Sequence, residues 1–220
     1  DIARGTGAET WLTQKLSGGY FENVQFDMQL QAAQNEDGEW DIGTDDMVAS
    51  FDVHDTRVDY RAPLAPVTNA AGSGRFEGDS LKIDVNEGKV FDMAVSNGSV
   101  FLDRVVEDGG TVDISLDLSG DFQQVLQYIA AEPIAVNEDT LGMDPADIQG
   151  TSDLNIHVSF PATRELLAEQ VKVVVDGTLD EARVENIVND MDLTGGPFAL
   201  SVKEGGVKLS GDGALDGQPL

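Results

Sequence analysis

The sequence has no cysteine, few aromatic residues and few basic residues. Without Cys, disulfide bonds, thiol chemistry and cysteine-based metal sites are excluded. Aromatic residues make up only 6 % of the 220 residues, too few to supply the aromatic platforms typical of sugar-cleaving sites. No apolar run approaches the roughly 18 residues of a membrane-spanning helix, and no signal peptide is visible. Any targeting or anchoring segment is therefore expected outside these residues.

Negative charge dominates the composition. The chain has 41 Asp and Glu against 13 Lys and Arg, which gives a formal net charge of -28. Such a field repels phosphate backbones, so no nucleic-acid partner is expected. It also repels an anionic membrane surface. We interpret the acidity as a solubility feature or an adaptation to a salty habitat rather than as a cation site.

Candidate catalytic groups are sparse. His54 and His157 are the only histidines, and neither stands near a nucleophile elbow or a phosphate-binding glycine loop, motifs that the chain lacks. The acidic runs at 36–46 and 138–147 do not have the ligand spacing of a calcium-binding loop. We predict no catalytic residue, no metal site and no cofactor. An enzyme that cleaves envelope glycan with two facing carboxylates is the weakest alternative.

Short β-strands are the main structural signal. Residues 112–118 alternate strictly, with Val112, Ile114 and Leu116 on one face and Asp or Ser on the other, as in a half-buried strand. Similar runs recur about every eight to twelve residues between turn signals, which favours an antiparallel meander, sandwich or barrel. Turns are expected at 77–79, 86–88, 97–98 and 203–206, and longer polar loops at 34–46 and 136–149.

Three further local features are predicted. The apolar alternation slips phase around His54-Asp55, which indicates a β-bulge. A short amphipathic helix is expected at 8–16. A second helix is expected from Phe122 to Ala130, capped by Asp121 and ended by Pro133. The whole chain, 1–220, is predicted to be a single β-rich segment of a larger protein, with one candidate sub-boundary near 62–72.

Periodicity leaves two arrangements of the apolar strand faces open. The faces can be sealed between two packed sheets, or they can line the concave side of a single curved sheet as an open trough for acyl chains. Physical reasoning alone favours the sealed core. An exposed apolar face of this length would mark a binding site.

Several short motifs carry a family resemblance. They include Leu118-Ser-Gly-Asp-Phe122, Leu141-Gly-Met-Asp-Pro145 and Val158-Ser-Phe-Pro161, with Trp11-Leu-Thr-Gln-Lys-Leu16 before them and Gly211-Asp-Gly-Ala-Leu-Asp-Gly217 after them. With these motifs the chain resembles the AsmA-like superfamily of YhdP/TamB type, and especially its YhdP branch of long bacterial envelope proteins. The resemblance spans nearly the whole chain.

The resemblance implies a fold and a function. The expected fold is all-β, a mainly antiparallel, elongated and curved or U-shaped sheet with a hydrophobic concave face and one or two short helices. The expected function is non-enzymatic: a periplasmic segment that binds or conducts phospholipid along a hydrophobic groove between the inner and outer membranes. The alternative is a structural or assembly β-sandwich module of the cell envelope.

Partners and site residues follow from the same expectation. The partner is phospholipid or another acyl-chain ligand, other envelope proteins are candidate partners, and the membrane anchor, in the inner membrane of a Gram-negative bacterium, lies in parts outside this segment. The apolar strand faces are the candidate lipid-binding residues: Ile114, Leu116, Leu118, Leu154, Ile156, Val158, Phe198, Leu200 and Val202.

Overall fold

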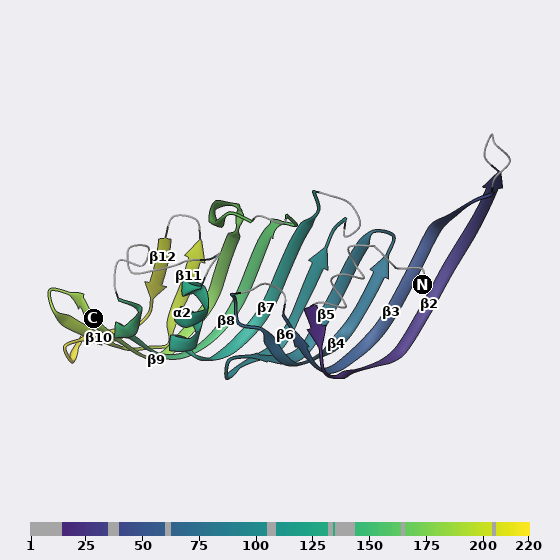
Figure 1. The fold of residues 1–220 in the computed structure, drawn as a ribbon. Coiled ribbons are helices and arrows are strands. Elements are labelled where there is room, and N and C mark those ends of the chain that lie inside the picture. Colours follow the sequence, from purple (N-terminus) through teal and green to yellow (C-terminus); the bar gives the residue numbers. More distant parts are fainter. Residues whose placement is uncertain are drawn as a thin grey trace.

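The protein is a single curved, open β-sheet. The computed structural model describes residues 15–34, 40–59, 63–104, 109–131, 134, 144–163, 166–203 and 206–220. In this part of the chain, 14 strands form one antiparallel sheet that does not close on itself, as expected. Figure 1 shows the sheet bent into a trough, with the β2–β3 hairpin projecting at one end and helix α2 on the inner side.

The strands vary in length from two to nineteen residues. Their bounds are β1 Leu16–Ser17, β2 Tyr20–Gln34, β3 Trp40–Val58, β4 Val67–Glu77, β5 Ser80–Val90, β6 Met93–Leu102, β7 Thr111–Asp121, β8 Ile148–Pro161, β9 Lys172–Val188, β10 Met191–Gly195, β11 Phe198–Lys203, β12 Gly206–Ser210, β13 Gly213–Leu215 and β14 Gln218–Pro219. The helices are α2 Phe122–Ala130 and the 3-10 turns η1 Pro145–Asp147 and η2 Ala168–Gln170.

The strands from β3 to β10 pair in sequence order, as a meander. At one end β2 and β1 share the outer edge of β3. At the other end β9 is long enough to pair with β11 through residues 175–179 and with β10 through 182–188. The candidate sub-boundary near 62–72 covers the end of the β3–β4 connection and the first half of β4, and these two strands pair with each other. A division there stays a prediction.

The alternation predicted at 112–118 sets the register of β7 and β8. Ile114 pairs with Val158, Leu116 with Ile156, and Leu118 with Leu154, so the apolar side chains of both strands point to the concave face. The polar residues between them point to the opposite face, which we call the outer face. Because a sheet presents alternate residues on opposite sides, one register error would exchange the two faces.

The bulge predicted near His54-Asp55 is confirmed. The β3–β4 register shifts between Val53 and Thr56, and Asp55 has a φ of 53°. The extra residue restores the inward direction of Thr56, which is 1 % exposed. The shift in the apolar alternation of the sequence therefore corresponds to a β-bulge in the strand.

Two predicted turns are wrong. Residues 86–88 lie inside β5 and residues 97–98 inside β6, and the chain reverses at 91–92 instead. At Gly98 the glycine is required by a close neighbour rather than by a turn, because an added Cβ would lie 2.4 Å from Leu116 Cδ2. Glycine within a strand commonly marks such an approach or a bulge, and the β6–β7 register does shift between Val95 and Asn97.

Two predicted loops are shorter than expected. Residues 40–46 belong to β3 and pair with the end of β2, and residues 148–149 belong to β8 and pair with β9. Both stretches lie in polar sequence that does not read as a strand. Their backbone groups are paired by neighbouring strands, and that pairing outweighs local composition. The turn at 77–79 and the hairpin across 203–206 are confirmed, since β4 pairs with β5 and β11 with β12.

The helix predicted after Asp121 is confirmed as α2. The Asp121 carboxylate accepts a hydrogen bond of 2.9 Å from the Gln123 backbone N–H, which caps the first turn. The helix ends at Ala130, and the terminating Pro133 lies outside the described residues. The helix predicted at 8–16 also lies mostly outside them, and its last residue, Leu16, belongs to β1.

The main hydrophobic core lies beneath α2. The buried face of the helix consists of Phe122, Val125 and Leu126, and these pack on the concave side of the sheet. The strand residues in this core come from β5 to β11 and include Val90, Met93, Val95, Leu118, Leu154, Val175, Leu179, Val184, Leu193, Phe198 and Leu200. The helix therefore covers part of the concave face and leaves the rest uncovered.

Candidate functional site

An apolar groove occupies the part of the concave face that lies beside the α2 core. It has a volume of about 360 Å³ and extends across the strands from β3 to β8. Lining side chains come from β1, from β3 to β8 and from segments beside these strands: Leu16, Phe51, Val53, Val58, Leu64, Val67, Ile83, Val85, Val100, Leu102, Val112, Ile114, Leu116, Ile156, Val158, Phe160 and Leu166, together with Val125, Tyr128 and Ile134 on the helix side. Aliphatic residues at this density form a surface suited to hydrocarbon.

Glycines in the strands let large side chains lie flat along the groove wall. Phe51 on β3 lies over Gly74 on β4, where an added Cβ would be 2.2 Å from the ring. Leu116 on β7 covers Gly98 on β6 in the same way. In each pair the large side chain occupies the space above the glycine, so the groove wall has no gap. The glycines also allow the sheet to bend.

The apolar surface continues beyond the groove onto β2. Phe21 packs edge-on against the groove residue Phe51, with 5.3 Å between ring centroids. Phe21 is 46 % exposed, and Val24 and Phe26 on the same strand are also exposed. The groove is therefore not closed off by polar residues on the β2 side.

The structure separates the predicted site residues into two groups. Ile114, Leu116, Ile156 and Val158 line the groove, and Leu118 lies at its margin, because it also belongs to the core beneath α2. The other four lie in or against the core beneath α2: Leu154, Phe198 and Leu200 are buried in it, and Val202 is partly buried against it.

Sequence reasoning missed the part of the lining contributed by β3, β4 and α2. Phe51 and Val53 follow a period-two alternation that does not place them in one groove with β7 and β8, and Val67, which follows two prolines, was not predicted to lie in a strand. Tyr128 and Val125 come from a helix whose position over the sheet no local pattern reveals. The apolar i, i+3 spacing on α2 was the one available signal, since it indicates that one face of this helix packs on another apolar surface.

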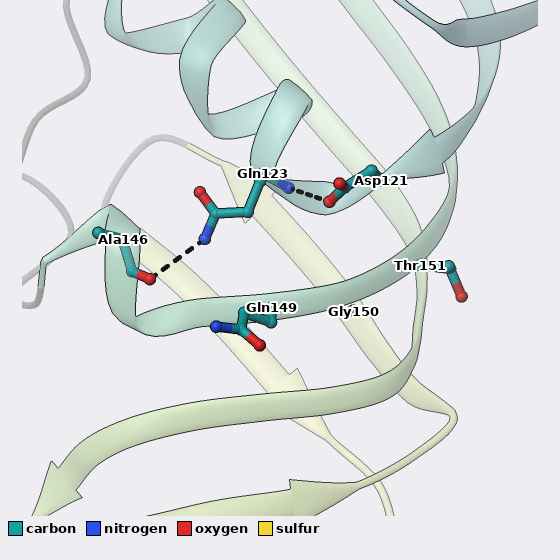
Figure 2. Close-up of a pocket in the computed structure, with 6 residues that line it drawn as sticks. All are labelled: Asp121, Gln123, Ala146, Gln149, Gly150 and Thr151. Atoms are coloured by element: carbon teal, nitrogen blue, oxygen red, sulfur yellow. Dashed lines mark hydrogen bonds between the residues drawn. The ribbon is translucent and has the colours of Figure 1, made fainter.

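A second, polar hollow lies at the start of α2 and measures about 480 Å³. Figure 2 shows Asp121, Gln123, Ala146, Gln149, Gly150 and Thr151 around it. The Gln123 side chain donates hydrogen bonds to the backbone carbonyls of Pro145 (3.0 Å), Ala146 (3.3 Å) and Ile148. These bonds hold the first turn of α2 to η1 and β8, so we assign the hollow a structural role.

On the outer face, hydrogen-bonded polar side chains form ladders that link neighbouring strands. Asp117 accepts hydrogen bonds from Asn155 (2.9 Å) and Asn97 (3.1 Å) on the two neighbouring strands. These bonds stabilise the charged carboxylate and lower the pKa of Asp117, with Asn155 the larger cause. The ladder joins three strands side by side without covering them.

Register also brings a serine and a histidine together on the outer face. Ser115 Oγ lies 3.0 Å from His157 Nδ1, and His157 Nε2 lies 3.8 Å from Asp113 Oδ1. Hydrolytic triads also need an oxyanion-stabilising site and a substrate pocket beside the nucleophile. Neither the groove nor the polar hollow includes these residues. We interpret the cluster as part of the outer polar ladder.

Two kinds of feature are absent from the residues that the structure describes. Within these ranges, no group of three or more His, Asp or Glu side chains is arranged to hold a metal ion. No helix in the described part of the chain is both long and apolar enough to cross a membrane.

Comparison with known protein families identifies the family of this chain. The model of the YhdP protein family matches residues 3–220. The chain belongs to the YhdP family. This family is AsmA-like and comprises bacterial envelope proteins, so the resemblance of the short motifs is confirmed. Neither the curated proteins nor the solved structures gave a match. What this YhdP-family chain binds is therefore argued from the groove alone.

Proposed function

We propose that this segment binds phospholipid acyl chains in the groove and conducts them, without catalysis, through the periplasm between the inner and outer membranes. The observation that carries the proposal is the uncovered apolar lining of a sheet that is otherwise polar on its outer face. Acyl chains placed there would remove water from apolar area, worth about 25 cal/mol per Å². Membership in a family of envelope proteins supports the location.

The openness of the sheet supports conduction rather than storage. A closed pocket would have to open for each ligand, whereas a groove across successive strands lets a chain slide between equivalent aliphatic positions. Ile114 on β7 and Val158 on β8 are such neighbours, paired in register. The headgroup would stay at the open side, where it keeps its water.

The test compares two substitutions that add the same charge one residue apart. In Val158→Asp the carboxylate enters the groove lining, and in Ser159→Asp it joins the outer face. Each protein is purified from bacteria and analysed by native mass spectrometry, with organic extraction of co-purified lipid. We expect phospholipid in defined stoichiometry with the unchanged chain and with Ser159→Asp, and its loss with Val158→Asp while the circular dichroism spectrum is kept.

The alternative of a structural or assembly module has its own observation. Of the described strands, β2 pairs only with β3, and it exposes Phe21 and Phe26. A free apolar edge of this kind can dock another strand. A lipid-free mass for the unchanged chain with a single cooperative unfolding transition would favour that module over lipid binding.

A further inference from the structure

We propose that the groove selects lipids by headgroup charge, and favours phospholipids with no net headgroup charge, such as phosphatidylethanolamine, over anionic ones such as phosphatidylglycerol. This inference rests on the proposed function, since it concerns the ligand of the same groove. Three observations carry it: the described lining has no cation, the two arginines near it are already paired, and carboxylates lie behind the groove wall.

The groove lining offers no positive group to a phosphate. Its residues within the described ranges include no Lys, Arg or His, and the only charged one is Asp84. The Asp84 carboxylate is held by Lys82, with 2.9 Å between Nζ and Oδ1. Sites that bind anionic headgroups use Arg or Lys forks or backbone N–H groups aimed at the phosphate. This lining instead recognises hydrocarbon only.

Two arginines close to lining residues along the chain are engaged by carboxylates. Arg57, which precedes the lining residue Val58, forms a 2.8 Å ion pair with Asp59. Its hydrogen bonds lower the pKa of Asp59, so this carboxylate stays charged beside it. Arg104 pairs with Asp103 at 3.2 Å. A lipid phosphate would have to displace one of these carboxylates to gain a counter-charge from either arginine.

Carboxylates lie behind the same wall. Asp113 and Asp117 alternate along β7 with lining residues, so only the thickness of one sheet separates them from the groove. Lys172 and His157 are the basic groups on this part of the outer face, against a formal net charge of -28 for the chain. The Debye length is about 30 Å at 0.01 M salt and about 3 Å at 1 M, so charges about 10 Å apart interact at low ionic strength and are screened at high ionic strength. An added negative headgroup is therefore repelled, and a zwitterionic one is not.

The experiment is a competition on vesicles that contain equal amounts of phosphatidylethanolamine and phosphatidylglycerol with identical acyl chains. The chain is incubated with them, separated by flotation, and its bound lipid is extracted and quantified. We expect phosphatidylethanolamine to be enriched about threefold or more at low salt and the ratio to approach one in 1 M NaCl. A ratio of one or below at low salt overturns the selection by charge but leaves lipid binding intact.

Two further outcomes separate this inference from the proposed function. If neither lipid is bound, both proposals fail. A pair of variants tests whether the charges behind the groove wall cause the selection. Asp113→Lys changes the charge behind the groove wall, and Asp212→Lys makes the same change between β12 and β13. We expect Asp113→Lys to shift bound lipid toward phosphatidylglycerol by more than Asp212→Lys does. Equal shifts would overturn the assignment to the groove wall.

Discussion

The concave face has two regions with the same sequence pattern and different environments. From Val112 to Leu118 on β7 and from Leu154 to Val158 on β8, the inward residues are aliphatic. Near α2, however, Leu118 and Leu154 are 7 % and 3 % exposed, whereas Ile114 and Val158 farther along the strands are only partly buried. One nine-residue helix makes the difference. Alternation therefore shows which face of a strand avoids water, and a separate element decides whether that face becomes core or binding surface.

The sharpest way to test this comparison is to truncate one residue in each region. Leu154→Ala removes a buried side chain beneath α2 and should lower the free energy of unfolding by about 2–5 kcal/mol. Ile156→Ala, two residues along the same face and strand, removes a side chain that still contacts water and should cost about 1 kcal/mol. Urea denaturation of both variants measures this. Equal losses would mean that the two regions are packed alike.

The glycine pairs of the groove wall give the next largest effect. Gly98→Ala places a methyl group against Leu116 and should destabilise the protein by about 1–3 kcal/mol through overpacking. The matched control is Ser99→Ala on the outer face of the same strand, which should change stability by less than about 0.5 kcal/mol. If thermal unfolding shows no difference between the two variants, Leu116 does not lie over Gly98.

Loosening the covering helix should cost less. Gln123→Ala removes the hydrogen bonds from α2 to the backbone carbonyls near η1, each worth about 0.5–1.5 kcal/mol net. Gln127→Ala changes the same residue type at an exposed position of the helix and serves as the control. Hydrogen exchange should show faster exchange in α2 for Gln123→Ala. Unchanged exchange there would show that the packing of Phe122 and Leu126 alone holds the helix.

The outer ladder behind the groove should contribute least. The pKa of Asp117 is lowered in the folded protein, so its contribution is present at neutral pH and is lost as the pH falls through that lowered value. Asn155→Ala should therefore reduce stability at pH 7 by about 0.5 kcal/mol or less, because solvent screens this site. The difference should vanish in acid. A constant difference between pH 7 and pH 2, measured by urea denaturation, would contradict this assignment.

The strands and their apolar faces could be predicted because period-two alternation is a local property. The bulge at His54-Asp55 and the cap at Asp121 were visible for the same reason. The turn predicted at Gly98 was wrong, since the sequence does not distinguish a glycine needed for close packing from a glycine needed for a turn.

The division of the concave face into core and groove could not be read from the sequence. It depends on where α2 lies over the sheet, and that position is set by contacts distant in the sequence. Leu154 and Val158 have equivalent places in the alternation, yet only Val158 lines the groove. A groove that forms where the helix leaves the sheet uncovered has no local sequence pattern that would predict it.

The central claim is that the uncovered region contacts lipid and the outer face does not. Site-specific photocrosslinking in bacteria tests it most directly, with a photoreactive phenylalanine analogue placed at Ile114 in the groove or at Asp113 on the outer face. We expect a phospholipid adduct, detected by mass spectrometry, at position 114 and none at position 113. Adducts of equal yield at both positions, or an adduct at position 113 alone, would contradict the account.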